Sequence, residues 1–168
     1  LKDIYGDWAL VAGAAEGLGA AYSRELAASG LNLILVDMQK EHLENLSREL
    51  EETFGVICKS LHLDLEADSS NTFMMEAVRA TGCRLLVYNA AFSRVQKFLE
   101  NDPLMLDRYV QVNIRTPLQF IYAFSAWHRG NTEFRKGMVL MSSMAGSWGT
   151  RLLGPYGGSK AFIHKLAE

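Results

Sequence analysis

Short apolar runs alternate with longer amphipathic segments along this chain, and this alternation constrains the fold most strongly. Apolar runs predict five strands, at residues 8–13, 31–37, 56–65, 84–91 and 137–143. Helical spacing predicts helices at 18–29, 39–54, 69–81 and 103–127, and from about Tyr156 onward. Apolar strands that alternate with helices are typical of a parallel sheet covered on both faces. We therefore expect an α/β fold with a doubly wound parallel sheet, in which ligands bind beyond the carboxyl ends of the strands.

Length and charge narrow the class of protein. The 168 residues predict a single domain, and the net charge of −2 gives no reason to expect a nucleic-acid or membrane partner. No apolar run reaches 18 residues, and the first residues lack a signal-peptide pattern. Cys58 and Cys83 lie in or beside apolar runs, which favours two reduced thiols over a disulfide and hence a cytoplasmic location. We expect no metal site.

A glycine-rich turn follows the first predicted strand. The stretch "AGAAEGLG" places Gly13, Gly17 and Gly19 between a strand and a helix. Without side chains, such a turn lets a pyrophosphate approach the backbone N–H groups at the helix N-terminus, where the helix dipole favours anions. The strand–turn–helix context favours dinucleotide binding over the alternative of a purely structural turn.

Two carboxylates follow the next two strands. Asp37 lies 18 residues beyond Gly19, where a carboxylate can accept hydrogen bonds from both ribose hydroxyls of an adenosine. It would repel a 2′-phosphate, as would Glu16, and Met38 adds no positive charge, so we expect NAD in preference to NADP. The alternative for Asp37 is a solvated turn residue. Asp64 can accept a hydrogen bond from the adenine amine or serve equally well as a turn carboxylate.

The stretch "YGGSK" raises the question of an acid–base pair. Tyr156 and Lys160 are four residues apart on a predicted helix and so share one face. An ammonium near a phenol lowers the pKa of tyrosine from about 10, which makes the phenol a usable acid–base group. Gly157 and Gly158 weaken a helix, which suggests that its backbone closely approaches another group, such as a cofactor. A chance pair on a solvated face is the alternative.

Two further polar residues are candidates for the same chemistry. Ser143, just past the fifth strand, can hydrogen-bond a substrate carbonyl oxygen, although its neighbour Ser142 competes for that role. Pro117 lacks the N–H that would bond the carbonyl of Asn113 in a regular helix. We expect a break in the helix and an ordered water on the Asn113 carbonyl, the alternative being a kink that serves packing alone.

Taken together, these pieces resemble the short-chain dehydrogenase/reductase family over the whole chain. The matching stretches are "AGAAEGLG", Asp37, "DL" at Asp64, "YNAA", "VNI", "MSSMAG" and "YGGSK", in the family's order and spacing. The opening 30 residues also resemble the branch that reduces 3-oxoacyl thioesters and steroid ketones. The resemblance implies a Rossmann-type domain over residues 1–168 that lacks the usual C-terminal strands and substrate lid, and a homo-oligomer for a full-length chain.

The resemblance also implies the activity and the site. The reaction is hydride transfer between NAD(H) and a carbonyl or secondary alcohol, with Tyr156 as the acid–base group, Ser143 orienting the substrate oxygen, Lys160 binding the nicotinamide ribose and Asn113 holding a relay water. The residues expected to hold the cofactor are Gly13, Ala15, Glu16, Gly17, Leu18, Gly19, Asp37, Asp64, Leu65, Asn89, Ala90, Ala91, Tyr156 and Lys160.

The chain departs from the family at two small positions. Ala12 stands where the family has threonine, and Ala91 stands where it has glycine, so a bracing hydroxyl is lost and a methyl group crowds the cofactor. A non-catalytic dinucleotide-binding or regulatory protein, or an inactive fragment, is therefore the alternative to an enzyme. The segments 92–102 and 145–153, the latter with Trp148 and Leu152, suggest an apolar mouth to a substrate pocket, the alternative being ordinary packing.

Overall fold

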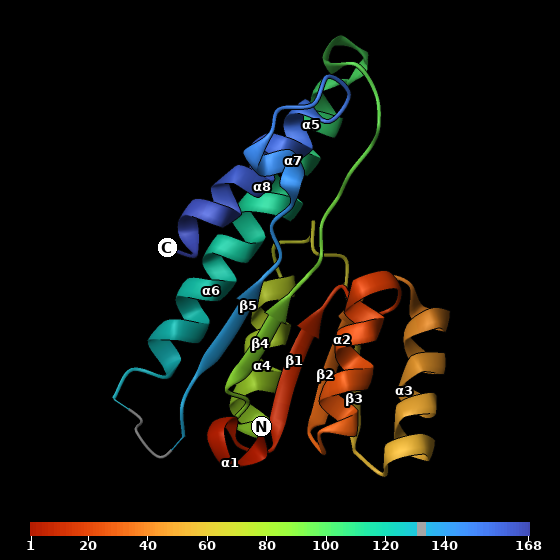
Figure 1. Cartoon of the computed structure of the whole chain (residues 1–168), viewed down its shortest axis with the longest axis vertical. Coiled ribbons are helices and arrows are strands. Elements are labelled where there is room, and N and C mark those ends of the chain that lie inside the picture. The colour runs from red at the N-terminus through yellow and green to blue at the C-terminus, as the bar shows by residue number, and fades with distance from the viewer. Residues whose placement is uncertain (131–133) are drawn as a thin grey trace.

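Five parallel strands form one sheet in the order β3-β2-β1-β4-β5 (Figure 1). The computed structural model describes residues 1–130 and 134–168. The strands are β1 (Trp8–Ala12), β2 (Asn32–Asp37), β3 (Cys58–His62), β4 (Leu85–Tyr88) and β5 (Gly137–Leu140). All five expected strands are present. Each is shorter than expected, because residues at the strand ends belong to the adjoining loops.

The expected helices are present, together with short ones that the sequence did not reveal. The long helices are α2 (Gly17–Ala28), α3 (Lys40–Phe54), α4 (Ser70–Thr81), α5 (Pro103–Val110), α6 (Thr116–Trp127) and α8 (Gly154–Leu166). The short ones are α1 (Lys2–Tyr5), the 3₁₀ turn η1 (Phe98–Glu100) and α7 (Met144–Ser147). A helix of one turn is too short to display a hydrophobic period, so these three were missed.

The helices cover the two faces of the sheet as separate layers. On one face, α2 and α3 bury Leu26, Leu43 and Leu50 against strand residues such as Val11 and Leu35. On the other face, α4 and α6 bury Met74, Phe120 and Phe124 against Leu10 and Ile34. Adjacent residues of one strand thus point to opposite layers, both apolar, which explains why the strands read as continuous apolar runs. The doubly wound fold is confirmed.

A π-helical turn, η2 (Gln111–Arg115), joins α5 to α6. Within it, the N–H of Thr116 donates to the carbonyl of Gln111, five residues earlier. The turn lies just before Pro117, which has no N–H to donate to the carbonyl of Asn113. The predicted break in this helix is therefore confirmed, and the water on the Asn113 carbonyl stays a prediction. Such turns inside helices are common at functional sites.

The strand register brings the expected site residues to one edge of the sheet. Ala12 is paired with Val36 on one side and with Tyr88 on the other, and Tyr88 is paired with Leu140. The residues that follow these positions are Gly13, Asp37, Asn89 and Met141. They therefore leave the sheet side by side, where a doubly wound fold binds its ligands.

Two further sequence predictions can be compared with the fold. Both cysteines, Cys58 and Cys83, are free thiols, as expected. Among the helices of the described residues, none has the length and apolar character needed to cross a membrane.

Candidate active site

Backbone contacts around the turn after β1 leave no room for side chains. Gly13 has a φ of 77°, and a Cβ on it would lie 2.7 Å from the Cα of Ala90. A Cβ on Gly19 would overlap the carbonyl of Gly13. The side-chain amide of Asn89 donates to that same carbonyl across 2.9 Å. The glycine-rich loop is thus packed against the start of α2 and against the loop after β4. The side chain of Asn89 supplies a stabilising hydrogen bond that the methyl group of Ala12 cannot make.

A cavity of about 580 Å³ opens beside this turn at the carboxyl edge of the sheet. Ten of the fourteen expected cofactor residues line it: Gly13, Glu16, Gly17, Leu18, Asp37, Asp64, Leu65, Asn89, Ala90 and Ala91. Four do not line it: Ala15, Gly19, Tyr156 and Lys160. Six lining residues were not expected: Met38, Gln39, Leu63, Phe92, Arg108 and Val112. Tyr156 and Lys160, both on α8, therefore lie outside this cavity, which has the size for a nucleotide.

Asp37 is fixed at the wall of this cavity by two backbone groups. One carboxylate oxygen accepts the N–H of Ala15 across 3.0 Å, and the other accepts the N–H of Gln39, also across 3.0 Å. The first bond reaches into the glycine-rich turn, so Asp37 is more than a solvated turn residue. Ala15 therefore serves the site through its backbone, although it does not line the cavity.

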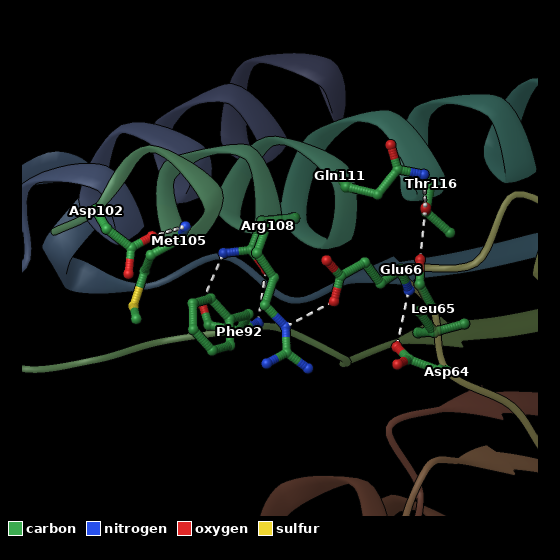
Figure 2. Close-up of polar contacts among 10 residues, drawn as sticks. Asp64, Leu65, Glu66, Phe92, Asp102, Met105, Arg108, Gln111 and Thr116 are labelled. Carbon is green, nitrogen blue, oxygen red and sulfur yellow. Dashed lines mark hydrogen bonds and ion pairs between the residues drawn. The ribbon is translucent and has the colours of Figure 1, made fainter.

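Asp64 and Arg108 also line the cavity, and Figure 2 shows the polar contacts around them. Asp64 accepts the N–H of Glu66 across 2.9 Å, so it is a turn carboxylate that also faces the cavity. The Nε of Arg108 lies 3.0 Å from a carboxylate oxygen of Glu66, and its guanidinium lies 4.7 Å from the centre of the Phe92 ring. Among the described residues, Arg108 is the one basic side chain that lines this cavity.

Thr116 ties this same wall to the helices. Its buried hydroxyl donates to the carbonyl of Leu65 across 2.8 Å (Figure 2). Leu65 lines the cavity, and Thr116 immediately follows the π-helical turn that contains Asn113. The wall of the nucleotide-sized cavity and the turn at Asn113 are thereby joined by one buried hydrogen bond.

Tyr156 and Lys160 share one face of α8, as their spacing predicts. The ammonium of Lys160 lies 5.7 Å from the centre of the Tyr156 ring and donates to the carbonyl of Met141 across 2.7 Å. Lys160 is only 4% exposed. Burial lowers its pKa from the usual 10.5 to about 8, because it disfavours the charged form. The hydrogen bond to Met141 favours the charged form and opposes this shift.

Asn113 connects three segments through its side chain. Its amide oxygen accepts the N–H of Phe92 across 2.6 Å, and its amide nitrogen donates to the carbonyl of Phe92 across 2.8 Å. The same nitrogen donates to the hydroxyl of Ser159 across 3.1 Å, and Ser159 donates to the carbonyl of Tyr156. The side chain of Asn113 therefore positions the loop after β4 and the first turns of α8 relative to η2.

The two serines after β5 have different surroundings. Ser142 donates its hydroxyl to the carbonyl of Lys160 across 2.9 Å, which anchors α8. Ser143 accepts the N–H of Ala145 and caps α7, and among the described residues its own proton has no partner. Ser143 is therefore the serine whose hydroxyl can serve a ligand.

Sequence comparison decides the family. The sequence model of the short chain dehydrogenase family matches residues 7–168. The chain belongs to the short-chain dehydrogenase family. The matched range spans the glycine-rich turn and the stretch from Asn113 to Lys160, and the expected resemblance is confirmed.

Among its relatives, this short-chain dehydrogenase is 30% identical to a 7β-hydroxysteroid dehydrogenase of Collinsella aerofaciens, over 100% of the chain and 63% of the relative. It is 32% identical to a very-long-chain 3-oxoacyl-CoA reductase of Yarrowia lipolytica, over 94% of the chain and 44% of the relative. The chain thus spans about 63% of the length of the 7β-hydroxysteroid dehydrogenases it matches.

Solved structures of similar fold hold either cofactor. A 7β-hydroxysteroid dehydrogenase superposes with a TM-score of 0.90 at 28% identity, covering 99% of this chain and 63% of that one. A metagenomic short-chain oxidoreductase in complex with NADP has a TM-score of 0.88 at 28% identity, covering 98% and 74%. A xylitol dehydrogenase bound to NAD⁺ has a TM-score of 0.84 at 25% identity, covering 98% and 64%.

The two glycines between Tyr156 and Lys160 differ in their packing in this short-chain dehydrogenase. A Cβ on Gly157 would lie 2.6 Å from the carbonyl of Ala145 in α7, whereas a Cβ on Gly158 would meet no atom of the described residues within 4 Å. The close approach is therefore of α7 to α8 at Gly157. The expected close approach of the backbone is thus present at Gly157, where the partner is α7, and among the described residues it is not present at Gly158.

The segments expected at the mouth of a substrate pocket are joined in this short-chain dehydrogenase. The N–H of Gln96 donates to the carbonyl of Leu152 across 3.0 Å, which links the segments 92–102 and 145–153. Trp148 is 70% exposed and Leu152 is 40% exposed. Apolar side chains thus remain accessible beside Ser143 and α7, although their role at a pocket stays a prediction.

Proposed function

We propose that this chain belongs to an NAD(H)-dependent oxidoreductase that transfers a hydride between the nicotinamide and a carbonyl or secondary alcohol. The observation that carries this proposal is the burial of the Lys160 ammonium beside Tyr156 at the carboxyl edge of the sheet. A lysine is almost never fully buried unless its charge is paired. Here the deprotonated phenol of Tyr156 would be the partner of that charge.

The residues of the chain have distinct roles in the proposed reaction. The nicotinamide supplies or accepts the hydride, and the close-packed glycine turn with the cavity beside it has room for such a dinucleotide. Tyr156 gives a proton to the substrate oxygen during reduction and takes it back during oxidation. Lys160 favours the phenolate by its positive charge. Ser143 donates its proton, which has no partner in the described part of the chain, to the substrate oxygen, and Asn113 keeps the helix that bears Tyr156 in place.

The cofactor preference follows from charge. Asp37 presents a carboxylate at the cavity wall, held by the N–H groups of Ala15 and Gln39, and Glu16 adds a second negative charge. A 2′-phosphate would meet these charges with no basic residue next to Asp37, since Met38 and Gln39 follow it. Ribose hydroxyls can instead donate to Asp37. We therefore propose NAD(H) over NADP(H).

The substrate class is proposed from the relatives and from the apolar mouth. Relatives named for 7β-hydroxysteroids and for very-long-chain 3-oxoacyl-CoA would act on bulky apolar molecules that bear a secondary alcohol or ketone. The exposed Trp148 and Leu152 can contact such a molecule. A hydrophobic ketone or 3-oxoacyl thioester is therefore our candidate substrate.

Turnover of NADH with a panel of steroid ketones and 3-oxoacyl thioesters tests the proposal, comparing the native protein with Tyr156→Phe. Loss of the acid–base group should reduce the rate by about 100-fold or more. NADH binding, followed by fluorescence, should be retained in both proteins. Equal background rates would contradict the proposal and favour a non-catalytic dinucleotide-binding protein.

A further inference from the structure

A small internal cavity lies behind the proposed active site, enclosed by β4, β5, η2, α6 and α8. Its volume is about 10 Å³, close to the smallest space that holds one water molecule. Its walls are mostly apolar, from Ala90, Pro117, Ile121, Leu140 and Ile163. The remaining lining residues are Tyr88, Asn113, Met141 and Lys160.

Tyr88, which lines this cavity, carries a buried hydroxyl that the fold does not explain. Tyr88 is 4% exposed, and its hydroxyl has no hydrogen-bond partner among the described residues. Its ring packs near Phe120 in the apolar layer, where a phenylalanine would fill the same space. A buried hydroxyl without a partner is costly, so its presence beside a cavity of this size points to a bound water.

Other polar groups of the cavity complete the coordination of such a water. Lys160 uses one ammonium proton for the carbonyl of Met141, and two protons remain. The carbonyl of Asn113 lacks its usual helical donor, because that donor position is Pro117. One water can accept hydrogen bonds from Tyr88 and Lys160 and donate one to Asn113, which gives the three partners typical of a buried water.

The water on the Asn113 carbonyl is already expected from the sequence, but the other groups that hold it are not. We propose that Tyr88 is a positioning residue whose hydroxyl fixes this water against the inner side of the Lys160 ammonium. The role of Lys160 rests on the proposed function, but the water site itself does not. Tyr88 does not line the nucleotide-sized cavity, whereas it lines the small cavity together with Lys160, so it acts through Lys160. Through this water, β4, which ends at Tyr88, restricts the position of the Lys160 ammonium on α8.

The first test compares Tyr88→Phe with the native protein in thermal unfolding. If the hydroxyl binds a water, its removal leaves that water short of a partner and the melting temperature falls. If the hydroxyl has no partner at all, replacing it by hydrogen raises the melting temperature, and that result would overturn the proposal. Tyr109→Phe is the matched control. The Tyr109 hydroxyl is bonded to the backbone of Arg94, so its loss should lower the melting temperature.

The second test measures the pH dependence of ketone reduction. In Tyr88→Phe the Lys160 ammonium loses a hydrogen-bond acceptor, so its charged form is less favoured. We therefore expect the alkaline limb of the Tyr88→Phe profile to move to lower pH. We also expect kcat to fall by about fivefold, while KM for NADH stays constant. Tyr109→Phe should leave the limb in place. Tyr88 and Lys160 are the titratable residues that line the cavity, and outside it Tyr156 faces the Lys160 ammonium, so the shift reports on the pair of Tyr156 and Lys160. An unmoved limb would overturn the positioning role.

A high-resolution crystal structure tests the same water site without depending on catalytic activity. We expect a water within hydrogen-bond distance of both Tyr88 Oη and Lys160 Nζ in the native protein, and its loss or displacement in Tyr88→Phe. An empty cavity in a well-ordered native crystal would overturn the proposal. This experiment and the melting temperature remain decisive even if the oxidoreductase activity proposed above is not found.

Discussion

Asn113 donates its side-chain amide to the hydroxyl of Ser159 across 3.1 Å, although the two residues are 46 positions apart in the chain. Ser159 lies between Tyr156 and Lys160 on α8, and Asn113 lies in the π-helical turn. This buried bond therefore fixes the helix that carries the proposed acid–base pair against the helix that packs on the sheet.

Removing this bond should weaken both the fold and the site. Ser159→Ala leaves the amide of Asn113 short of one partner, so we expect the free energy of unfolding to fall by about 1–2 kcal/mol in urea titration. We also expect kcat to fall, because Tyr156 loses its positional restraint. Ser29→Ala is the control, since Ser29 is exposed and bonds only within its own helix. Equal losses in the two variants would contradict the prediction.

The two glycines of "YGGSK" should respond oppositely to substitution. Gly157→Ala places a methyl group 2.6 Å from the carbonyl of Ala145, and we expect a loss of about 1–3 kcal/mol as α7 is displaced. Gly158→Ala meets open space and removes a flexible residue from a helix, so we expect a gain of about 0.5–1 kcal/mol. Thermal unfolding of the pair measures the difference. Similar changes in both variants would show that the α7–α8 contact does not restrict this position.

The buried ammonium should make stability depend on pH above neutrality. Burial lowers the pKa of Lys160 to about 8 from 10.5, so between these values the unfolded chain binds a proton that the folded chain lacks. Stability from this group therefore rises with pH across that window, by at most about 1.4 kcal/mol per pH unit. In urea titrations at about pH 7.5 to 10, the stability of the native protein should rise relative to that of Lys160→Met. The difference between the two curves is the measure, because burial also raises the pKa of Cys58 and Cys83 and makes the stability of both proteins depend on pH. Parallel curves would mean that the lysine titrates normally.

The charge of Asp37 should control the choice of cofactor. Asp37→Asn keeps an amide oxygen that can accept one of the two backbone N–H groups, and it removes the charge that repels a 2′-phosphate. We expect the ratio of NADPH to NADH affinity to rise about tenfold or more, measured by fluorescence titration. Asp107→Asn makes the same change of charge on α5 outside this cavity and should leave the ratio unaltered. A native preference for NADPH would overturn the assigned role of Asp37.

The sequence was most informative where a feature depends only on residues a few positions apart in the chain. The glycine spacing after a buried strand, the four-residue interval from Tyr156 to Lys160 and the missing N–H of Pro117 each follow from backbone geometry alone. The expected turn, shared helix face and irregular helix are all present. Ten of the fourteen expected cofactor residues line one cavity, because strand ends in a parallel sheet converge on one edge.

The sequence was least informative where a role depends on a distant partner. Nothing near Arg108 indicates that its guanidinium would meet Glu66 and Phe92 at the cavity wall. Equally, adjacent serines cannot be told apart until α8 packs against β5 and takes the hydroxyl of Ser142. These assignments need the relative placement of segments far apart in the chain.

By itself, the sequence determined the order of strands and helices, the phosphate-type turn, and the residue types available for acid–base chemistry, because period, glycine spacing and proline act over a few residues. Only the tertiary structure decided that Gly157 serves the packing of α7, that Ser142 anchors α8 while Ser143 keeps its proton, and that Lys160 is buried with Tyr88 behind it. Burial, contact and hydrogen-bond pairing are properties of segments brought together by folding, and local spacing does not encode which segments meet.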